Sequence, residues 1–483
     1  MPTTIALVAD PHFALQASGR QHCTRLPEAR YLLQRIVEYV NITGGIDLLC
    51  VAGDVVVDDG DTRGALGIVK TILDKLPCPY VVIPGDRDQN RDAFAEIFPL
   101  PEHLDLPGVR VIPFADPTRA DGHAERLPAD IARTEHLCRD FRGRVVTLQH
   151  LPLFPPGAGD SRCGYVNAAE LCAQYRRLGI TLSISGHDHL GLPTLHDGGC
   201  SYRRVPGLCE SPYPFQLATL ADDGRCSFRT IKLRHDQPVH DCHTHSRFAY
   251  CCDDLDVAIE RRLMDMLNIE RVAVTEHSGH LFFTARDYWS IRDWFRGSPV
   301  RPPENDRSEA YLQHVKDMVA SDPRFLSGLE VDVDRNGQLL INNRLRQNLD
   351  FLIGSIHFLD DPKAPEAPDQ FLFMAEKLMA TGVIRAIAHP YRVFTWDGVG
   401  CKPAHTFDTM VAMLKRYGVA AELSFHHNRP SPEFFRKCLD AGVKISFGSD
   451  THSLFKLGFF NPHFDFLRSI GYDGDFQDIA LRL

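Results

Sequence analysis

Short apolar runs that end in aspartate or histidine recur along the whole chain. In the first half, the polar residues at these ends are Asp10, His12, Asp54, Asp86, His150, His187 and His189. Amphipathic helical patterns, such as residues 28–40 and 168–179, separate the runs. Because the carboxyl ends of strands in layered α/β folds meet at one edge, we expect these side chains to lie together.

The composition of this set indicates a site for two metals. Oxygen and imidazole ligands without thiolates suit manganese, iron or zinc. Two neighbouring metals need a shared carboxylate, and Asp54 is the natural bridge. The remaining ligands divide into Asp10, His12 and His189 for one metal, and Asp86, His150 and His187 for the other. Any one of these residues is equally compatible with a helix cap or a packed side chain, but their ordered recurrence favours the metal site.

The pattern restarts after the polar junction "RHDQPVHDCHTHSRF" at residues 234–248. Here the polar strand ends are His243, His245, Glu276, His277, Glu330, His357, His389, Asp450 and His452. Helical patterns lie between the runs, and alternating β/α units with polar strand ends indicate a (β/α) barrel. The chain is therefore predicted to be α/β throughout, with one domain at residues 1–235 and a second at residues 238–483.

Composition narrows the classes of function. A chain of 483 residues is too long for one ordinary core. Its net charge of −10 disfavours a nucleic-acid partner. No apolar run reaches membrane-spanning length and the N-terminus lacks a signal-peptide pattern, so we expect a cytoplasmic protein without a membrane segment. The 14 cysteines show no CxxC pairs and are expected to be reduced packing residues. Nothing in the sequence indicates an oligomeric state.

The first half resembles a known family. The motifs that carry the resemblance are Asp10-x-His12, Gly53-Asp54, Gly85-Asp86-Arg87-Asp88, His150 after a strand, and Gly186-His187-x-His189. In this order they are similar to the calcineurin-like metallophosphoesterases. The resemblance implies a four-layer αββα sandwich whose two metals align a hydroxide against a phosphodiester, a pyrophosphate or a phosphomonoester.

Arg87 is a departure from that family, which usually has Gly-Asn-His-Asp where this chain has Gly-Asp-Arg-Asp. An arginine cannot act as a general acid near neutral pH, but it can hold phosphoryl oxygens. We therefore expect Arg87 to bind substrate and, together with Asp54, to serve catalysis. Asp88 is expected to support the loop. The change favours substrates whose leaving group needs no protonation.

The second half resembles the polymerase and histidinol phosphatase (PHP) family, through the nine strand-end residues and the motifs "TEHSG", "GLEVDV", "IGSIHFL" and "GSDTHS". The resemblance, closest to histidinol-phosphatase-like members, implies a distorted (β/α)7 barrel with three metals held by all nine residues. Arg392 and Arg429 are candidates to bind the substrate phosphate, or else are solvated surface arginines. His426 and His427 are expected to be loop residues.

Together these patterns predict a bifunctional metal-dependent phosphoesterase with two metals in the first domain and three in the second. The first domain would cleave a phosphodiester or pyrophosphate, and the second would hydrolyse a phosphomonoester of a small molecule, in sequence. One alternative assigns phosphodiesterase chemistry, on a cyclic phosphate or a nucleotide, to the PHP domain and leaves the first domain weakly active or regulatory. A nuclease is a further alternative, but it needs a basic groove with stacking aromatics that the sequence does not show.

Overall fold

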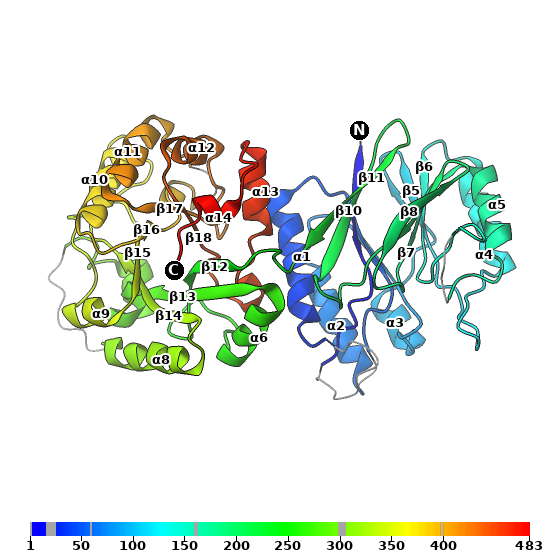
Figure 1. Cartoon of the computed structure of the whole chain (residues 1–483), viewed down its shortest axis with the longest axis horizontal. Helices are drawn as coiled ribbons and strands as arrows, with labels where there is room; N and C mark the ends of the chain where they lie inside the picture. The colour runs from blue at the N-terminus through cyan, green and yellow to red at the C-terminus, as the bar shows by residue number, and fades with distance from the viewer. Residues whose placement is uncertain are drawn as a thin grey trace. The chain divides into compact units, whose positions relative to one another are not determined.

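The computed structural model describes residues 2–15, 26–57, 60–158, 163–297, 306–396, 398 and 400–483. The chain divides into two compact units, residues 1–234 and 235–483, drawn at the blue-to-green and green-to-red ends of the colour range (Figure 1). Each unit has its own sheets and its own core.

The first unit contains two sheets. The five-stranded sheet has the order β11 (Cys226–Lys232), β10 (Pro214–Leu220), β1 (Thr3–Val8), β2 (Leu48–Ala52) and β3 (Tyr80–Ile83). The six-stranded sheet has the order β4 (Leu104–Leu106), β5 (Val109–Pro113), β6 (Arg144–Leu148), β7 (Ile180–Ser185), β9 (Cys200–Arg204) and β8 (Leu192–Asp197). Of the strands that precede the polar motifs, β1, β2 and β3 run parallel to one another in the first sheet, and β6 and β7 run parallel to each other in the second. The carboxyl ends of these strands therefore lie at one edge of each sheet.

Apolar side chains from both sheets form the core of this unit. Leu7 of β1 and Cys50 of β2 share one cluster with Val111 of β5 and Val146 of β6, which shows that the sheets pack face to face. The helices of the unit are α1 (Ala29–Thr43), α2 (Thr62–Leu73), α3 (Arg91–Ile97), α4 (Pro128–Arg139) and α5 (Ala168–Leu178).

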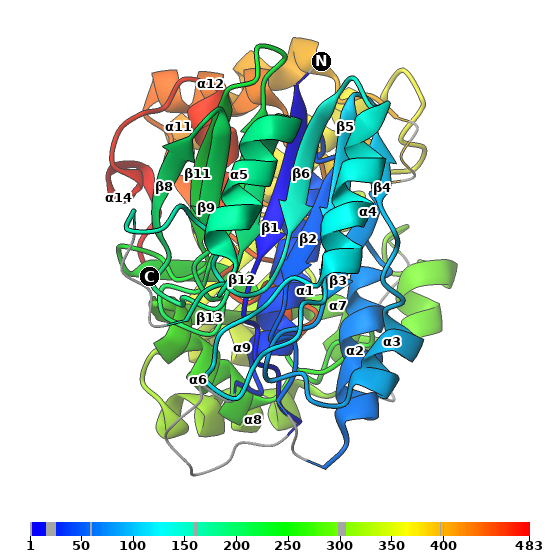
Figure 2. The same ribbon diagram turned by 90° about the vertical axis from the view of Figure 1, so that its right-hand side faces the viewer.

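Helices cover the outer faces of these sheets. On α1, the Tyr39 ring packs against Phe215 of β10 with 5.3 Å between centroids. Helices α4 and α5 lie in front of the six-stranded sheet (Figure 2), where Leu137 and Tyr175 share an apolar cluster with Ile112 of β5. The mixed α/β class is therefore confirmed for this unit, and the αββα layering in detail stays a prediction.

The second unit is built on one parallel seven-stranded sheet. Its strands follow chain order: β12 (Val239–Thr244), β13 (Ile269–His277), β14 (Phe325–Asp332), β15 (Phe351–Ser355), β16 (Ala386–Ile387), β17 (Ala420–Leu423) and β18 (Ile445–Phe447). The sheet nearly closes on itself, because Thr244 at the end of β12 bridges Thr451 just after β18. Asp450 N also donates to the His243 carbonyl at 2.8 Å. The result is a nearly closed parallel barrel.

Helices alternate with these strands, and Figure 1 shows several of them around the barrel. They are α6 (Val257–Leu267), α7 (Ser278–Phe282), the π-helical turn η1 (Asp287–Ile291), α8 (Ser308–Ser321), α9 (Asn343–Asn348), α10 (Ala367–Ala380), α11 (Phe407–Tyr417), α12 (Pro432–Ala441), α13 (Asn461–Ser469) and α14 (Phe476–Ile479). Short 3₁₀ turns are η2 (Arg392–Phe394), η3 (Ala404–Thr406) and η4 (Leu454–Lys456).

Local signals explain where several of these helices begin and end. Asp256 caps α6 by accepting hydrogen bonds from the backbone N–H groups of Ala258 and Ile259. Gly179 ends α5 in the left-handed conformation with φ of 69°, which glycine adopts without steric cost. Within the described residues, every helix is too short or too polar to cross a bilayer.

Candidate metal centres

Asp54, which follows β2, lies between two groups of side chains in the first unit. Its Oδ2 is 3.6 Å from Nε2 of His12, and its Oδ1 is 3.3 Å from Nε2 of His150. The carboxylate is buried. Because its two oxygens face different histidines, Asp54 has the geometry of a carboxylate that bridges two metals.

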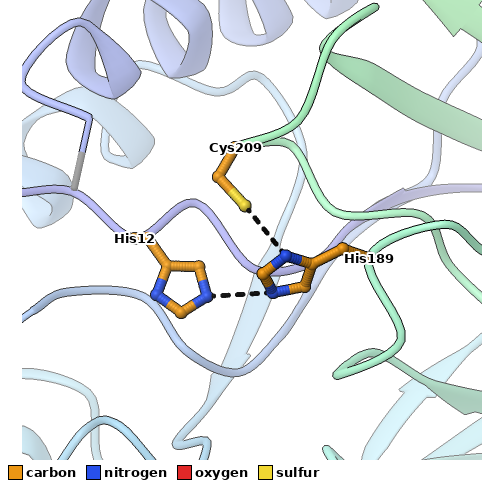
Figure 3. A group of neighbouring side chains, drawn as sticks. All are labelled: His12, His189 and Cys209. Carbon is orange, nitrogen blue, oxygen red and sulfur yellow. Dashed lines mark hydrogen bonds between the residues drawn. The ribbon is translucent and has the colours of Figure 1, made fainter. Parts of the chain in front are cut away.

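The group on one side of Asp54 contains Asp10, His12 and His189. The Nε2 atoms of His12 and His189 are 3.2 Å apart, and Oδ1 of Asp10 is 3.7 Å from Nε2 of His189. Figure 3 shows Cys209 on the opposite side of the His189 ring, with its Sγ 3.6 Å from Nδ1. Oε1 of Glu210 is 3.4 Å from the same Nδ1. These two neighbours, which the sequence analysis does not identify, direct Nε2 of His189 toward His12.

The group on the other side contains Asp86, His150 and His187. Oδ1 of Asp86 is 3.0 Å from Nε2 of His150 and 3.0 Å from Nδ1 of His187. Nδ1 of His150 lies 2.7 Å from the carbonyl oxygen of Ala52, which can only accept a hydrogen bond. His150 therefore carries a proton on Nδ1, and its Nε2 is the atom that faces the two aspartates.

The backbone at this edge adopts a rare conformation. Asp10, His12, Asp54 and His187 have positive φ angles of 51°, 46°, 50° and 65°. Non-glycine residues enter this region at an energetic cost, and they cluster at functional sites. Gly85 lies so close to Asp54 that a Cβ at this position would overlap the Asp54 carboxylate, so the position requires glycine. The strand ends are thus bent so that all seven predicted residues meet.

Glu330, at the end of β14, is the centre of a second cluster. Its Oε1 is 3.3 Å from Nε2 of His357 and 2.8 Å from Nε2 of His389. Its Oε2 is 2.5 Å from Nδ1 of His277 and 3.6 Å from Nε2 of His243. Glu330 therefore has the same relationship to its histidines as Asp54 has in the first unit.

Asp450 extends the second cluster. Its Oδ1 is 3.0 Å from Nε2 of His245 and 3.6 Å from Nε2 of His243. Nitrogen atoms of His245, His277 and His452 lie within 4.8 Å of one another. The structure thus brings together all the residues predicted for this centre except Glu276.

Glu276 lies behind the cluster. Its Oε2 accepts hydrogen bonds from the backbone N–H and the hydroxyl of Ser246 at 3.1 and 2.7 Å, and its Oε1 accepts one from the His277 N–H at 2.9 Å. Oε1 is also 3.4 Å from Nδ1 of His245, whose Nε2 faces Asp450. The structure therefore places Glu276 against the Nδ1 side of His245, away from Glu330 and Asp450. The reason is that local backbone donors hold its carboxylate.

Two further carboxylates, which the sequence analysis does not select, support histidines in the same way. Oε1 of Glu422 in β17 is 2.7 Å from Nδ1 of His243, and Oδ1 of Asp332 in β14 is 2.6 Å from Nδ1 of His357. Carboxylates in this position fix the tautomer and the orientation of metal-binding histidines. Asp332 could have been found from sequence, since it follows Glu330 by two residues on a strand and so shares its face.

Unsatisfied buried atoms show that the second cluster fits metal ions. Within the described residues, Nε2 of His243, both ring nitrogens of His277, Nε2 of His357 and Oε2 of Glu330 are buried and form no well-aligned hydrogen bond, although Oε2 lies 2.5 Å from Nδ1 of His277 and 3.6 Å from Nε2 of His243. Buried polar groups without well-formed hydrogen bonds are costly, and a bound metal ion would supply the missing partners. Imidazole nitrogens and carboxylate oxygens converging on one point suit divalent transition metals.

The protonation of several histidines also suits metal binding. Burial lowers the pKa of His12 to about 4 and that of His452 to about 4. Burial, together with the nearby charge of Arg392, lowers the pKa of His389 to about 3. Each ring is therefore neutral at physiological pH, and the neutral form is the one that binds metals.

The two candidate phosphate-binding arginines have different surroundings. Arg392 is buried, donates to Oδ2 of Asp450 at 2.7 Å and lies 2.7 Å from Nε2 of His389. Arg429 is exposed, and among the described residues no ion pair or hydrogen bond joins it to the cluster. His426 is half-buried and stacks on His452 with 4.5 Å between centroids, outside the set around Glu330.

Cys251 and His280 were not predicted as ligands, and the sequence analysis treats Cys251 as a packing residue. The structure places Cys251, His277 and His280 so that one donor atom of each lies within 4.8 Å of the others. Nε2 of His280 is buried without a partner among the described residues. The only sequence signal was that Cys251 follows His245 closely in the same loop.

Residues 3–191 match the family described as Calcineurin-like phosphoesterase. The first unit contains a calcineurin-like metallophosphoesterase domain. The family match supports a metal-dependent hydrolase of phosphate esters. The carboxylate and imidazole groups around Asp54 are ligands that suit divalent metals.

Two curated relatives, each named "Probable phosphatase", were also found. One from Acetivibrio thermocellus is 27% identical over 157 residues, covering 30% of this chain and 60% of the relative. One from Aeromonas hydrophila subsp. hydrophila is 29% identical over 159 residues, covering 30% of this chain and 59% of the relative. The chain thus spans about three fifths of the length of each.

Solved structures include a dimetal phosphatase from Danio rerio, with a TM-score of 0.42 and 16% identity, covering 48% of this chain and 96% of that chain. Another is a Listeria monocytogenes protein whose suggested activity is that of a histidinol phosphatase. It has a TM-score of 0.36 and 14% identity, and the match covers 45% of this chain and 97% of that chain.

In the metallophosphoesterase domain, the loop after β3 gives its two central residues different tasks. Asp88 is buried, and its carboxylate accepts hydrogen bonds from the backbone N–H groups of Val55, Val56 and Gly85 at 2.8 to 3.0 Å. It therefore joins this loop to the one after β2. The Arg87 side chain is half exposed, with Nε 3.5 Å from Oδ2 of Asp86. Arg87 thus stands at the solvent-facing side of the cluster, where a substrate can approach.

Proposed function

We propose that the chain is a bifunctional metal-dependent phosphoesterase. Its first domain, residues 1–235, would hydrolyse a phosphodiester or pyrophosphate, and its second, residues 238–483, would be a PHP domain that hydrolyses the phosphomonoester of a small molecule. The observation that carries the proposal is the presence of two separate clusters, each centred on a carboxylate, Asp54 or Glu330, whose two oxygens face different histidines.

The first centre would hold two metals through the groups that meet at Asp54, and the second would hold three through the groups around Glu330 and Asp450. Bound divalent metals supply a hydroxide at neutral pH and neutralise charge on the phosphoryl group. Arg87 would bind phosphoryl oxygens at the open side of the first centre, through the paired N–H donors of its guanidinium. Arg392 would do so in the second centre, where it already lies against Asp450.

The two domains would act in sequence. Cleavage of a diester or pyrophosphate leaves a monoester, and a monoesterase removes the remaining phosphate. Support for this order comes from the different openings of the two clusters. In the first, Asp86, His187 and His189 are 20 to 29% exposed, whereas the residues around Glu330 are nearly all enclosed. A wider site accepts a phosphate substituted on both sides, and an enclosed one favours a terminal phosphate.

Separate inactivation of the centres tests the division of labour. We expect His12→Ala to abolish hydrolysis of bis(p-nitrophenyl) phosphate while hydrolysis of p-nitrophenyl phosphate continues, and His243→Ala to do the reverse, with Mn²⁺ present. His240→Ala is the matched control, because His240 lies on β12 with His243 but pairs with Glu270 at 3.1 Å, outside the cluster. If one variant removes both activities, the proposed division is wrong. Loss of diester cleavage in His243→Ala alone would assign that chemistry to the second domain.

A further inference from the structure

A cavity of about 380 Å³ opens beside the second cluster. His357, which faces Glu330, forms part of its wall. The other walls are Trp289, Arg292, Phe358, Leu359, Asp360, Asp361, Pro362, Lys363, Val393, Phe394 and Trp396. This volume lies in the usual range for small-molecule sites. We call this cavity the tryptophan pocket.

Trp289 connects the pocket to the cluster. It belongs to the π-helical turn η1, a conformation that is rare and often found at functional sites. Its ring lies 6.0 Å from the His357 ring and 5.9 Å from the His277 ring, measured between centroids. On the pocket side it lies 6.2 Å from Trp396. A molecule whose phosphate reaches the histidines therefore places its remaining part against these two indoles.

Trp396 is the outer wall of the pocket. It is 48% exposed, which is unusual for so large an apolar side chain. The guanidinium of Arg392 lies 4.7 Å from its ring centroid, and Arg392 in turn donates to Asp450 at 2.7 Å. The arginine thus fixes the indole in place relative to the cluster. An indole held in this way offers its exposed surface to a flat partner.

The charges around the pocket select against a cationic ligand. The basic residues of the wall are Arg292, which lies 4.3 Å above the Phe358 ring, and Lys363. The guanidinium of Arg392 stacks on Trp396 but is paired with Asp450. Of the two acidic residues in the wall, Asp360 is already paired with Arg335 at 2.9 Å. A neutral aromatic ring attached to an anionic phosphate agrees with this arrangement, whereas a protonated amine does not.

We propose that the tryptophan pocket binds the planar heteroaromatic ring of the substrate, so that the second centre hydrolyses a nucleoside monophosphate. This inference rests on the proposed phosphomonoesterase function. The base would stack on Trp396, and the edge of the base would contact Trp289. Base stacking on an aromatic side chain raises affinity by about 5- to 150-fold.

The test compares adenosine 5′-monophosphate with ribose 5-phosphate, which has the same primary phosphate ester and no base. Full-length protein carrying His12→Ala is used with Mn²⁺, so that hydrolysis reports the second centre. We expect kcat/KM for the nucleotide to exceed that for the sugar phosphate at least tenfold. In Trp396→Ala we expect the ratio of the two kcat/KM values to fall to nearly one, and in Trp396→Phe we expect most of the nucleotide preference to remain. Phe373→Ala, which removes a ring that is 44% exposed on α10, leaves it unchanged.

Two results would overturn the inference. One is equal or better use of ribose 5-phosphate by the native pocket, and the other is a preference for the nucleotide that survives Trp396→Ala. If neither ester is hydrolysed, the proposed phosphomonoesterase function fails, and calorimetric binding then decides the inference separately. Tenfold tighter binding of the nucleotide, lost in Trp396→Ala, supports the pocket, and equal binding of the two compounds refutes it.

Discussion

Glu422 holds His243 from behind: its Oε1 lies 2.7 Å from Nδ1 of the histidine, so Nε2 faces Glu330 and Asp450. The two residues are 179 positions apart in the chain. The other oxygen of Glu422 accepts a hydrogen bond from the backbone N–H of His389. One buried carboxylate therefore sets the direction of one predicted ligand and the backbone position of another.

We expect Glu422→Gln to weaken metal binding by the second centre about 10- to 100-fold, because loss of such a carboxylate lowers the basicity and order of the histidine. Titration with a chelator, followed by metal analysis of the protein, measures the change. Glu376→Gln is the control, since Glu376 lies on α10 and contacts the Tyr417 hydroxyl and Arg416. Equal metal retention by the two variants would contradict the role given to Glu422.

Asp54→Asn should remove metal from both positions of the first centre at once. The amide is neutral and offers one oxygen where the carboxylate offers two, so the groups around His12 and His150 both lose the shared anionic bridge that two neighbouring metals need. We expect the bound metal per chain to fall by about two, while the second centre keeps its own metals. Inductively coupled plasma analysis of the purified variant measures this, with the exposed Asp140→Asn as control. Full metal content in Asp54→Asn would show that the residue is not a bridge.

Substitution of Arg87 should lower activity, whereas substitution of Asp88 should lower stability. Arg87→Ala is expected to reduce kcat/KM of the first centre about 10- to 100-fold with unchanged metal content, because it removes a phosphoryl-oxygen donor from the exposed side. Arg63→Ala, which breaks an exposed ion pair with Glu96, is the control. A large loss of bound metal in Arg87→Ala would instead assign the residue to the metal site itself.

Asp88→Ala should lower the stability of the first unit. The substitution leaves the backbone N–H groups of Val55, Val56 and Gly85 without their acceptor. We expect the unfolding free energy of the first unit to fall by about 1–3 kcal/mol. Thermal unfolding followed by circular dichroism checks this against Asp74→Ala, an exposed residue for which the expected change is below about 1 kcal/mol. A melting temperature equal to that of the control would refute the supporting role.

Much of both clusters could be predicted from sequence, because one rule places the residues. A parallel strand delivers its last side chains to a common edge, so Asp54 after β2 and His150 after β6 meet although 96 positions separate them. The same rule brings Glu330 and His389 together at the end of the barrel. The order of polar residues at the strand ends is therefore enough to predict which side chains meet.

The supporting residues could not be predicted in this way. Asp332 is the exception, since its spacing from Glu330 puts both on one face of β14. Glu422 acts through the far side of the His243 ring, and only the packed fold shows that this carboxylate lies there. The same holds for Arg392 and Arg429, which look equivalent in the sequence. One is buried against Asp450 and the other is exposed, because the 3₁₀ turn η2 directs Arg392 inward. For a related reason the sequence does not show that Ser246 holds the Glu276 carboxylate, whose role as a metal ligand stays a prediction.

A buried acid away from both clusters should make the stability of the second unit depend on pH. Glu260 lies on α6, and burial together with the charges of Asp256 and Asp254 raises its pKa from 4.5 to about 8. The folded state thus keeps a proton that the unfolded state releases above pH 4.5. The stabilisation is complete below that pH and is lost as the pH rises toward 8.

Glu260→Gln removes the titration, so it should stabilise the unit by a few kcal/mol more at pH 8 than at pH 5, on the order of the shift multiplied by 1.36 kcal/mol per unit. Urea unfolding at both pH values measures the difference. Glu309→Gln, on an exposed part of α8, should show none. A variant that gains equally at both pH values would show that Glu260 does not carry this proton.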